Sequence, residues 1–319
     1  ELDPTTAHVV TVPGAVDAWA TLSADHGRLG LDRLLQSAIR YAEDGFVVHE
    51  RTAYDFAGAA GKLAKDEGAK ATYFNGSGKP PEAGDVLRQP ALAQTLKAIA
   101  AKGRDAFYEG AVAEDIVKTL KAKGGLHELS DFAGAKGEYV DPIRTNYRGY
   151  DIFECPPNGV GVIALLMLNI VEALPVSNDP LAVDRLHRLL ETTRLAYRDR
   201  NAFVADPKFS DVPLETLLSK EYAAKLAASI DPGHAAENLP PAGMPPHEDT
   251  VYLCVVDQDG NACSFINSLF KSFGSGIVAK DSGVVLQNRG FGFVLEDGHP
   301  NHIAPKKRPM HTIIPGMAV

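Results

Sequence analysis

Cysteine is scarce in this sequence. The 319 residues include three cysteines, Cys155, Cys254 and Cys263, and no two of them form a CxxC pair. An odd number without framework spacing argues against a disulfide scaffold and is typical of a reducing compartment. We therefore predict a cytoplasmic rather than a periplasmic location. We also predict that the three thiols serve as small apolar side chains of the core.

Long apolar runs and a basic excess are also missing. The longest apolar stretch, residues 160–174, is interrupted by Asn169 and Glu172 and is too short to cross a bilayer. Acidic residues outnumber basic ones by 41 to 32, which gives a net charge of −9. This balance argues against nucleic acid or a membrane as a partner. The hydrophobic content of 45% is that of a globular protein with a true core.

Signatures of metal, nucleotide and serine-hydrolase chemistry are absent as well. There is no HExxH motif, and His299 and His302 lie in a proline-containing turn, so we predict no metal. The glycine-rich residues 76–80 lack the GxxxxGK[ST] spacing and are predicted to form a loop. Ser275 is not in a GxSxG elbow, because Phe273 stands where that motif needs glycine. We expect no organic cofactor either.

Helical periodicity dominates the first two thirds of the chain. Apolar residues recur at helical spacing in five stretches, and each is predicted to be a core-facing helix: 15–22, 31–42, 90–102, 111–123 and 184–200. The segment from Gly27 to Gly30 separates the first two helices.

The character of the sequence changes at Thr250. Residues 237–248 hold four prolines and few apolar residues, which predicts an extended linker. Residues 250–257 then read as a strand, and a turn leads to a second strand at 262–268. The first strand is apolar on both faces, so we expect it inside a layered sandwich. A third strand is predicted at 284–288. A linker that delivers a threonine to a buried strand suits a self-cleaving precursor.

Residues 250–262, TVYLCVVDQDGNA, resemble the start of the small subunit of the gamma-glutamyltranspeptidases. Other matches follow in family order: TVPGAVDAW at 11–19, PPNG at 156–159, GSGIV at 274–278 and KRP at 307–309. The resemblance implies an N-terminal-nucleophile (Ntn) hydrolase, an α/β protein of the α+β kind with a four-layer αββα sandwich. The family pattern extends beyond both ends of this chain. We therefore expect the fold to be incomplete here and the oxyanion hole to come from residues outside it.

The resemblance also implies where the precursor is cut. The scissile bond would join Asp249 and Thr250, which divides the chain into a large-subunit portion, 1–249, and the start of a small subunit, 250–319. We expect both parts to remain associated in one structural domain. The freed α-amine has a reference pKa of about 7.7–8.0, so it can act as the base for the Thr250 hydroxyl. A homodimer is compatible with this arrangement.

Ser268 aligns with a family hydroxyl that hydrogen-bonds the nucleophile. The alternative is a strand serine whose hydroxyl is satisfied by backbone, and the sequence leaves both interpretations open.

Three positions depart from the pattern of true glutamyl transferases. A family Asn is Phe270 here, a Gln is Arg289, and an Asp that would bind the substrate ammonium is Gly292. An ammonium without its carboxylate partner is costly to bury, so glutathione should bind poorly. The sequence around these residues resembles the cephalosporin acylase-like branch of the family. This resemblance implies that the substrate is a small-molecule amide with a glutaryl-type acyl group. Arg289 would bind the carboxylate of that acyl group in a bidentate pair, or would be a structural arginine.

A non-catalytic interpretation belongs to a different class of protein. A family member that fails to cleave itself would act as a binding protein. Retention of Thr250 behind a proline-rich linker argues for the enzyme. The basic triplet 306–308 is a weak signal for nucleic acid in an acidic chain, and we predict a structural role for it at a strand entry.

Overall fold

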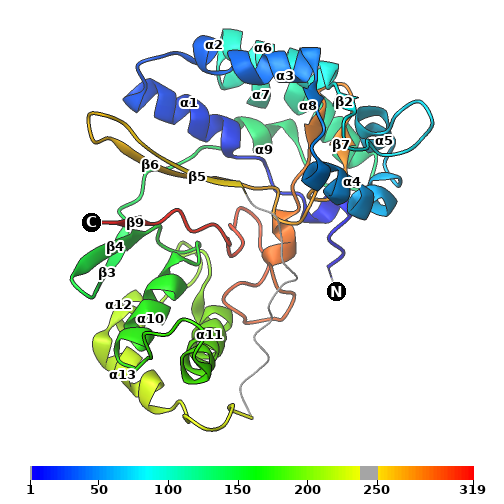
Figure 1. Cartoon of the computed structure of the whole chain (residues 1–319). Coiled ribbons are helices and arrows are strands. Elements are labelled where there is room, and N and C mark those ends of the chain that lie inside the picture. Colours follow the sequence, from blue (N-terminus) through cyan, green and yellow to red (C-terminus); the bar gives the residue numbers. More distant parts are fainter. Residues whose placement is uncertain (1, 238–250) are drawn as a thin grey trace. The chain divides into compact units, whose positions relative to one another are not determined.

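The computed structural model describes residues 2–237 and 251–319. Most of the predicted linker lies outside the described residues, as do Asp249 and Thr250. The chain forms two compact units (Figure 1). Unit 1 comprises Glu1–Glu138 and Leu269–Phe291, and unit 2 comprises Tyr139–Ser268 and Gly292–Val319. Each unit draws residues from both sides of the predicted 249–250 cleavage site.

Unit 1 is mainly helical. Its helices are α1 (Ala15–His26), α2 (Leu31–Leu34), α3 (Gln36–Asp44), α4 (Glu50–Leu63), α5 (Glu67–Tyr73), α6 (Pro90–Lys102), α7 (Asp105–Tyr108), α8 (Ala111–Lys121), α9 (Leu129–Ala133) and the 3-10 turn Ala7–Val9. Two short antiparallel pairs accompany them: β1 (Phe46–Val47) with β2 (Val86–Leu87), and β7 (Val278–Ala279) with β8 (Val284–Val285).

The returning segment 269–291 is part of the core of unit 1. Ile277 and Leu286 are buried in the same apolar cluster as Ile116 of α8. Strand β7 packs against α5 and α8, as Figure 1 shows. The buried carboxylate of Asp66 accepts the N–H of Val278 at 3.1 Å and also caps α5. A segment distant in sequence is therefore held at fixed positions within this unit.

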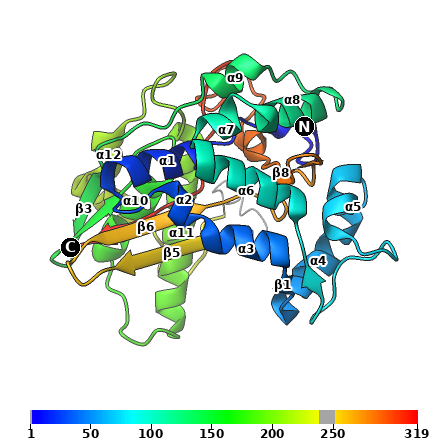
Figure 2. The same ribbon diagram turned by 90° about the horizontal axis from the view of Figure 1, so that it is seen from above.

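Unit 2 combines a small sheet, a helical cluster and a hairpin. Strands β3 (Ile143–Tyr147), β4 (Tyr150–Glu154) and β9 (Met317–Ala318) form an antiparallel sheet in that order. The helices are α10 (Gly161–Glu172), α11 (Val183–Phe203), α12 (Leu214–Leu218) and α13 (Lys220–Ala228). The apolar helix α10 is buried against the other three. Strands β5 (Val251–Val256) and β6 (Ala262–Asn267) form the hairpin, seen from above in Figure 2.

Most predicted elements are confirmed, with two differences in detail. The helices predicted at 15–22, 90–102, 111–123 and 184–200 are present as α1, α6, α8 and α11. The stretch 31–42 is divided at Leu35 into α2 and α3. The strand predicted at 284–288 is reduced to β8, because residues 286–288 bond to other segments of unit 1. None of the described helices is long and apolar enough to cross a membrane.

The predicted burial of the strand at 250–257 is wrong for its described residues. All six residues of β5 are exposed. Among the described strands β5 pairs with β6 alone, so no second layer covers either face. Cys254 and Cys263 lie on this hairpin and are exposed, as is Cys155. The prediction that the three thiols belong to the core is therefore also wrong.

Candidate functional site

Ser268 directly follows the hairpin that begins after the predicted cleavage site. The antiparallel register pairs Val251 with Asn267 and Val256 with Ala262. Ser268 is half-buried in unit 2. The predicted nucleophile Thr250 and its neighbour Asp249 are outside the described residues, so their roles stay predictions.

Phe270 and Arg289 are brought together in unit 1. The guanidinium carbon of Arg289 lies 4.1 Å from the centroid of the Phe270 ring. Both side chains are buried, with 5% of Arg289 and 8% of Phe270 exposed. A cation stacked on an aromatic face is attracted by the ring quadrupole, and the attraction grows as water is removed. The Phe270 ring thus fixes the plane of the Arg289 guanidinium.

Asn288 joins the two segments that carry these residues. Its side-chain oxygen accepts the N–H of Lys271 at 3.1 Å, and its own N–H bonds to the carbonyl of Leu269 at 3.2 Å. Its side-chain amide donates to the carbonyl of Pro4 at 3.0 Å. Asn288 is fully buried, and Phe270 adopts a φ of +75° between the two bonded residues. The bonds hold 269–271 against 288–289 in a conformation that a non-glycine residue rarely adopts.

Gln287 and Gly290 fix the other side of Arg289. The Gln287 amide donates to both the carbonyl and the hydroxyl of Thr11 at 2.6 Å, and its oxygen accepts the N–H of Arg289. A Cβ at position 290 would lie 2.8 Å from the carbonyl oxygen of Val9. Only glycine allows this close approach, so the backbone beside Arg289 is packed directly on the N-terminal segment.

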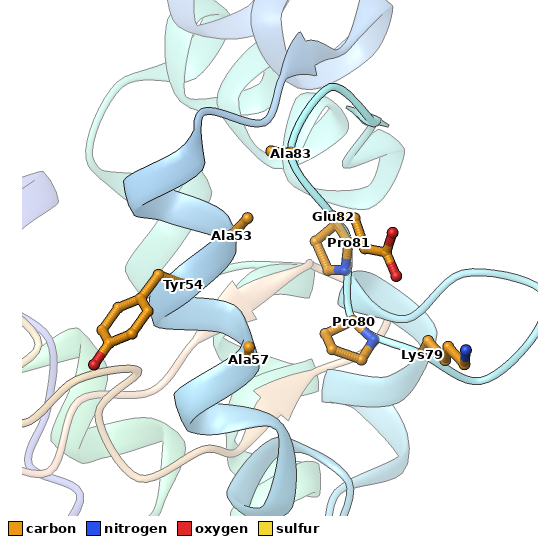
Figure 3. A pocket seen from close by; sticks show the side chains of 8 residues that line it. All are labelled: Ala53, Tyr54, Ala57, Lys79, Pro80, Pro81, Glu82 and Ala83. Carbon is orange, nitrogen blue, oxygen red and sulfur yellow. The ribbon is translucent and has the colours of Figure 1, made fainter.

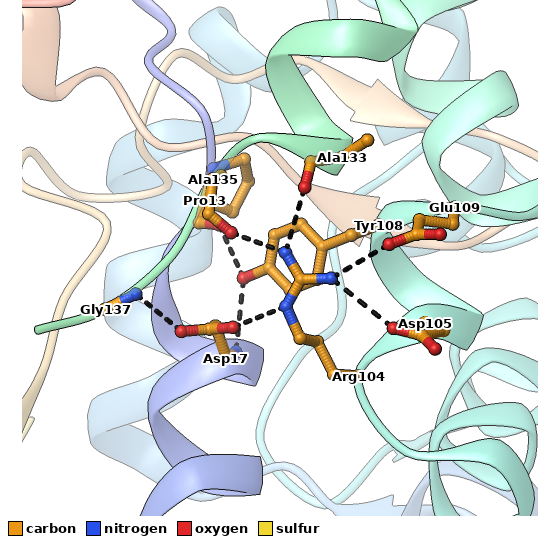
Figure 4. Close-up of polar contacts among 9 residues, drawn as sticks. All are labelled: Pro13, Asp17, Arg104, Asp105, Tyr108, Glu109, Ala133, Ala135 and Gly137. Atoms are coloured by element: carbon orange, nitrogen blue, oxygen red, sulfur yellow. Dashed lines mark hydrogen bonds and ion pairs between the residues drawn. The ribbon is translucent and has the colours of Figure 1, made fainter.

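The 11–19 motif that supports Gln287 is itself anchored by a polar cluster. Figure 4 shows Asp17 receiving the Arg104 side chain at 2.5 Å and the N–H of Gly137 at 2.6 Å. The Arg104 guanidinium lies 4.5 Å from the ring centroid of Tyr108, whose hydroxyl donates to the carbonyl of Pro13 at 2.7 Å. Burial raises the pKa of Tyr108 to about 12, so this hydroxyl remains a donor at physiological pH. The motif therefore has a clear structural role.

Gly292 belongs to unit 2, apart from the unit that contains Phe270 and Arg289. A Cβ at this position would lie 3.0 Å from the carbonyl oxygen of Met310. That separation is tighter than ordinary van der Waals contact, so a side chain at position 292 would require a shift of a few tenths of an ångström at the Met310 carbonyl. With glycine in place, the position offers no carboxylate.

Two residues of this region were not predicted. Lys271 places its ammonium 4.2 Å from the centroid of the Phe291 ring, and the rings of Phe291 and Phe270 are 6.5 Å apart. We call Phe270, Lys271, Arg289 and Phe291 the cation–aromatic cluster. Adjacency to Phe270 and Arg289 in the sequence was the available signal, but the pairing depends on how 269–271 folds against 288–291.

A pocket elsewhere in unit 1 contains none of the predicted site residues. It lies between α4 and the loop that follows α5, as Figure 3 shows, and its volume is about 430 Å³. Its lining is mainly apolar and consists of Ala53, Tyr54, Ala57, Lys79, Pro80, Pro81, Glu82 and Ala83. Residues 76–80 form a turn beside it, as predicted from their sequence.

Arg308 of the basic triplet has a structural partner in unit 2. The buried carboxylate of Asp206 accepts the N–H of Arg308 at 2.9 Å and its guanidinium at 3.3 Å. Burial acts to raise the pKa of Asp206, but the hydrogen bonds from Arg308 and Lys208 outweigh burial and lower it. This contact supports the predicted structural role of the triplet.

The residues that the structure describes include no group of three or more His, Cys, Asp or Glu side chains suited to a metal ion. His299 and His302 instead bond to backbone carbonyls of Asn201 and Glu296.

The matches between this chain and known proteins cover its whole length. The model of the Gamma-glutamyltranspeptidase family matches residues 1–319. The chain belongs to the gamma-glutamyltranspeptidase family. Its mixed helix-and-sheet structure is of the Ntn-hydrolase type found in this family.

Three similar proteins illustrate the variety of activities named in this family. The glutathione hydrolase-like YwrD proenzyme of Bacillus subtilis (strain 168) is 40% identical over 309 residues, which cover 97% of this chain and 58% of the relative. The oxamate amidohydrolase proenzyme of Klebsiella pneumoniae is 36% identical over 314 residues, or 97% of this chain and 58% of the relative. The crystal structure of cephalosporin acylase from Bacillus halodurans matches with a TM-score of 0.89 at 37% identity, covering 100% of this chain and 59% of that chain.

The chain thus spans about 58% of the length of the curated relatives it matches. Both of these relatives are named as proenzymes of hydrolases, which gives no support to the non-catalytic alternative.

Proposed function

We propose that the complete protein is a self-cleaving amidohydrolase or acyltransferase that takes small amides whose acyl group ends in a carboxylate. The observation that carries the substrate class is the buried Arg289 stacked on Phe270. A guanidinium presents paired N–H donors that match a carboxylate, and stacking fixes the plane in which they point. A glutaryl-type group, with no ammonium beside its carboxylate, fits this chemistry.

The proposed nucleophile is Thr250, released by cleavage of the bond after Asp249. In the precursor its hydroxyl attacks the preceding carbonyl, and water opens the resulting ester to leave a new amino terminus. That α-amine then removes the hydroxyl proton as the hydroxyl attacks the substrate amide, and the amine of the substrate departs. Water or an acceptor amine releases the acyl group from the acyl-enzyme. The threonine supplies both the nucleophile and the base in these steps, which require no metal or organic cofactor.

The hairpin register supports a role for Ser268 in this chemistry. In an antiparallel pair, each step toward the amino terminus of one strand is matched by a step toward the carboxyl terminus of the other. Val251, the residue after the proposed nucleophile, pairs with Asn267, the residue before Ser268. We propose that the Ser268 hydroxyl hydrogen-bonds the threonine and holds its oxygen in position for attack.

Selection against γ-glutamyl groups is proposed to come from Gly292. Glycine stands where the family pattern has an aspartate for the substrate ammonium, so this position supplies no carboxylate. An ammonium buried without a carboxylate costs several kcal/mol. Glutathione hydrolysis remains the second candidate, because the Bacillus subtilis relative at 40% identity is named as glutathione hydrolase-like.

A comparison of two chromogenic amides tests the substrate class. We expect the complete protein to hydrolyse glutaryl-p-nitroanilide with a kcat/KM at least about tenfold above that for γ-glutamyl-p-nitroanilide, which corresponds to about 1.4 kcal/mol. Equal rates, or a preference for the γ-glutamyl amide, would contradict the proposed selection. Association of the two subunits, dimerisation and a cytoplasmic location remain predictions for the complete protein.

A further inference from the structure

The cation–aromatic cluster is built from two segments that exchange cation–ring contacts. One segment supplies the Phe270 ring and the Lys271 ammonium, and the other supplies the Arg289 guanidinium and the Phe291 ring. Arg289 stacks on Phe270 at 4.1 Å and Lys271 on Phe291 at 4.2 Å, so each segment's cation lies on the other segment's ring. The two rings are tilted by 45° at a centroid separation of 6.5 Å. Both cations are therefore oriented by the same pair of aromatic side chains.

The two halves of the cluster differ in burial. Arg289 and Phe270 are buried, whereas Lys271 and Phe291 are half-buried. Lys271 and Phe291 are thus the more accessible half of the cluster. The backbone of Lys271 is also fixed, since its N–H bonds to the buried Asn288. A long side chain held at both its backbone and its charged end loses little further freedom when it binds a ligand.

We propose that Lys271 is a second cation that determines substrate specificity, acting with Arg289 on the carboxylate of the acyl group. This inference rests on the proposed function and names a residue for it. Two fixed positive charges attract a carboxylate and repel an ammonium on the neighbouring carbon. Lys271 therefore favours acyl groups that end in a carboxylate and disfavours γ-glutamyl groups, which carry both charges.

The test compares Lys271→Gln, Lys271→Arg and the matched control Lys280→Gln in the complete protein. Lys280 is an exposed lysine of the same segment, so its replacement removes the same charge outside the cluster. We expect Lys271→Gln to lower kcat/KM for the glutaryl amide about tenfold, mainly through KM, as loss of a charge-assisted contact should. The same variant should raise kcat/KM for the γ-glutamyl amide about twofold. Lys271→Arg should retain the wild-type preference, and Lys280→Gln should leave both values unchanged.

The opposite direction of the two changes separates specificity from a structural role. A lysine that only packs on Phe291 would affect both substrates in the same direction, and that result would overturn the inference. An effect of Lys280→Gln equal to that of Lys271→Gln would also overturn it, because any lysine of the segment would then have the same effect on kcat/KM.

A binding measurement distinguishes this inference from the proposed function. Calorimetric titration of glutarate into the complete wild-type protein reports recognition without turnover, because glutarate has no amide bond to cleave. Tight binding that weakens about tenfold in the Lys271→Gln background supports the inference even if the wild-type protein hydrolyses neither amide. Glutarate binding that is unchanged by Lys271→Gln refutes the inference even if glutaryl amides are hydrolysed.

Discussion

Single charged side chains in this protein are fixed by neighbours of distinct kinds. Arg289 is oriented by an aromatic face, whereas Asp206 is held by hydrogen bonds from Arg308 and Lys208. Asp206 is 1% exposed, so its carboxylate depends on these donors for the contacts that water would otherwise supply. The aromatic face of Phe270 fixes the plane of the Arg289 guanidinium, whereas the donors around Asp206 occupy its carboxylate. The Asp206 arrangement suits stability.

The Asp206 pair gives a pH-dependent prediction. The pKa of Asp206 is lowered in the folded state, so the stability it contributes is present above its unfolded pKa of about 3.9 and is lost as pH falls through the folded value. We expect Asp206→Asn to reduce the free energy of unfolding by about 1–3 kcal/mol at pH 7. Urea denaturation should show this difference shrinking toward pH 3. The exposed Asp211→Asn is the control, and a difference that grows on acidification would refute the assigned sign.

At the scale of elements, the segment 269–291 supplies all four residues of the cation–aromatic cluster in unit 1. It returns to a helical unit formed by a distant part of the chain and is held by Asp66, Thr11 and Pro4. The 11–19 motif supports this segment through Thr11, which accepts a hydrogen bond from the Gln287 amide. The same motif is anchored by the pair of Asp17 with Arg104. The position of Arg289 thus depends on residues that are distant from it in the sequence.

Packing at Gly290 is the most direct test of that dependence. We expect Gly290→Ala to lower the free energy of unfolding by about 1–3 kcal/mol, because its Cβ would meet the Val9 carbonyl at 2.8 Å. It should also weaken glutarate binding by displacing Arg289. Gly58→Ala is the matched control, since Gly58 lies within α4 with nothing near its Cβ, and should stabilise the protein by about 0.5–1 kcal/mol. Thermal denaturation that shows equal effects would contradict this packing.

Sequence periodicity predicted elements better than it predicted burial. Helix α6 has the bounds that its apolar spacing predicted, and Pro90 in its first turn and Gly103 after its last residue suit those ends. The break at Leu35 was missed because no glycine or proline marks it. Burial of β5 was wrongly predicted because apolar residues on both faces indicate cover without saying which segment supplies it. The contact between Lys271 and Phe291 could not be predicted, because it depends on tertiary folding of two short segments.

At the scale of the whole molecule, the two compact units do not follow the predicted subunits. Each unit combines residues from before and after the 249–250 bond. Cleavage of that bond would therefore leave each unit built from both products. Loss of one peptide bond leaves the apolar clusters within each unit intact, so we expect the two products to stay associated without a covalent link.

The central claim is that Thr250 is a nucleophile released by self-cleavage, and one measurement tests it most directly. Intact-mass spectrometry with amino-terminal sequencing of the complete protein, incubated after purification, should reveal two products, one of which begins at Thr250. The Thr250→Ala protein should remain a single uncut chain. A wild-type protein that stays uncut, or a Thr250→Ala protein that is cut at the same bond, would contradict the assignment.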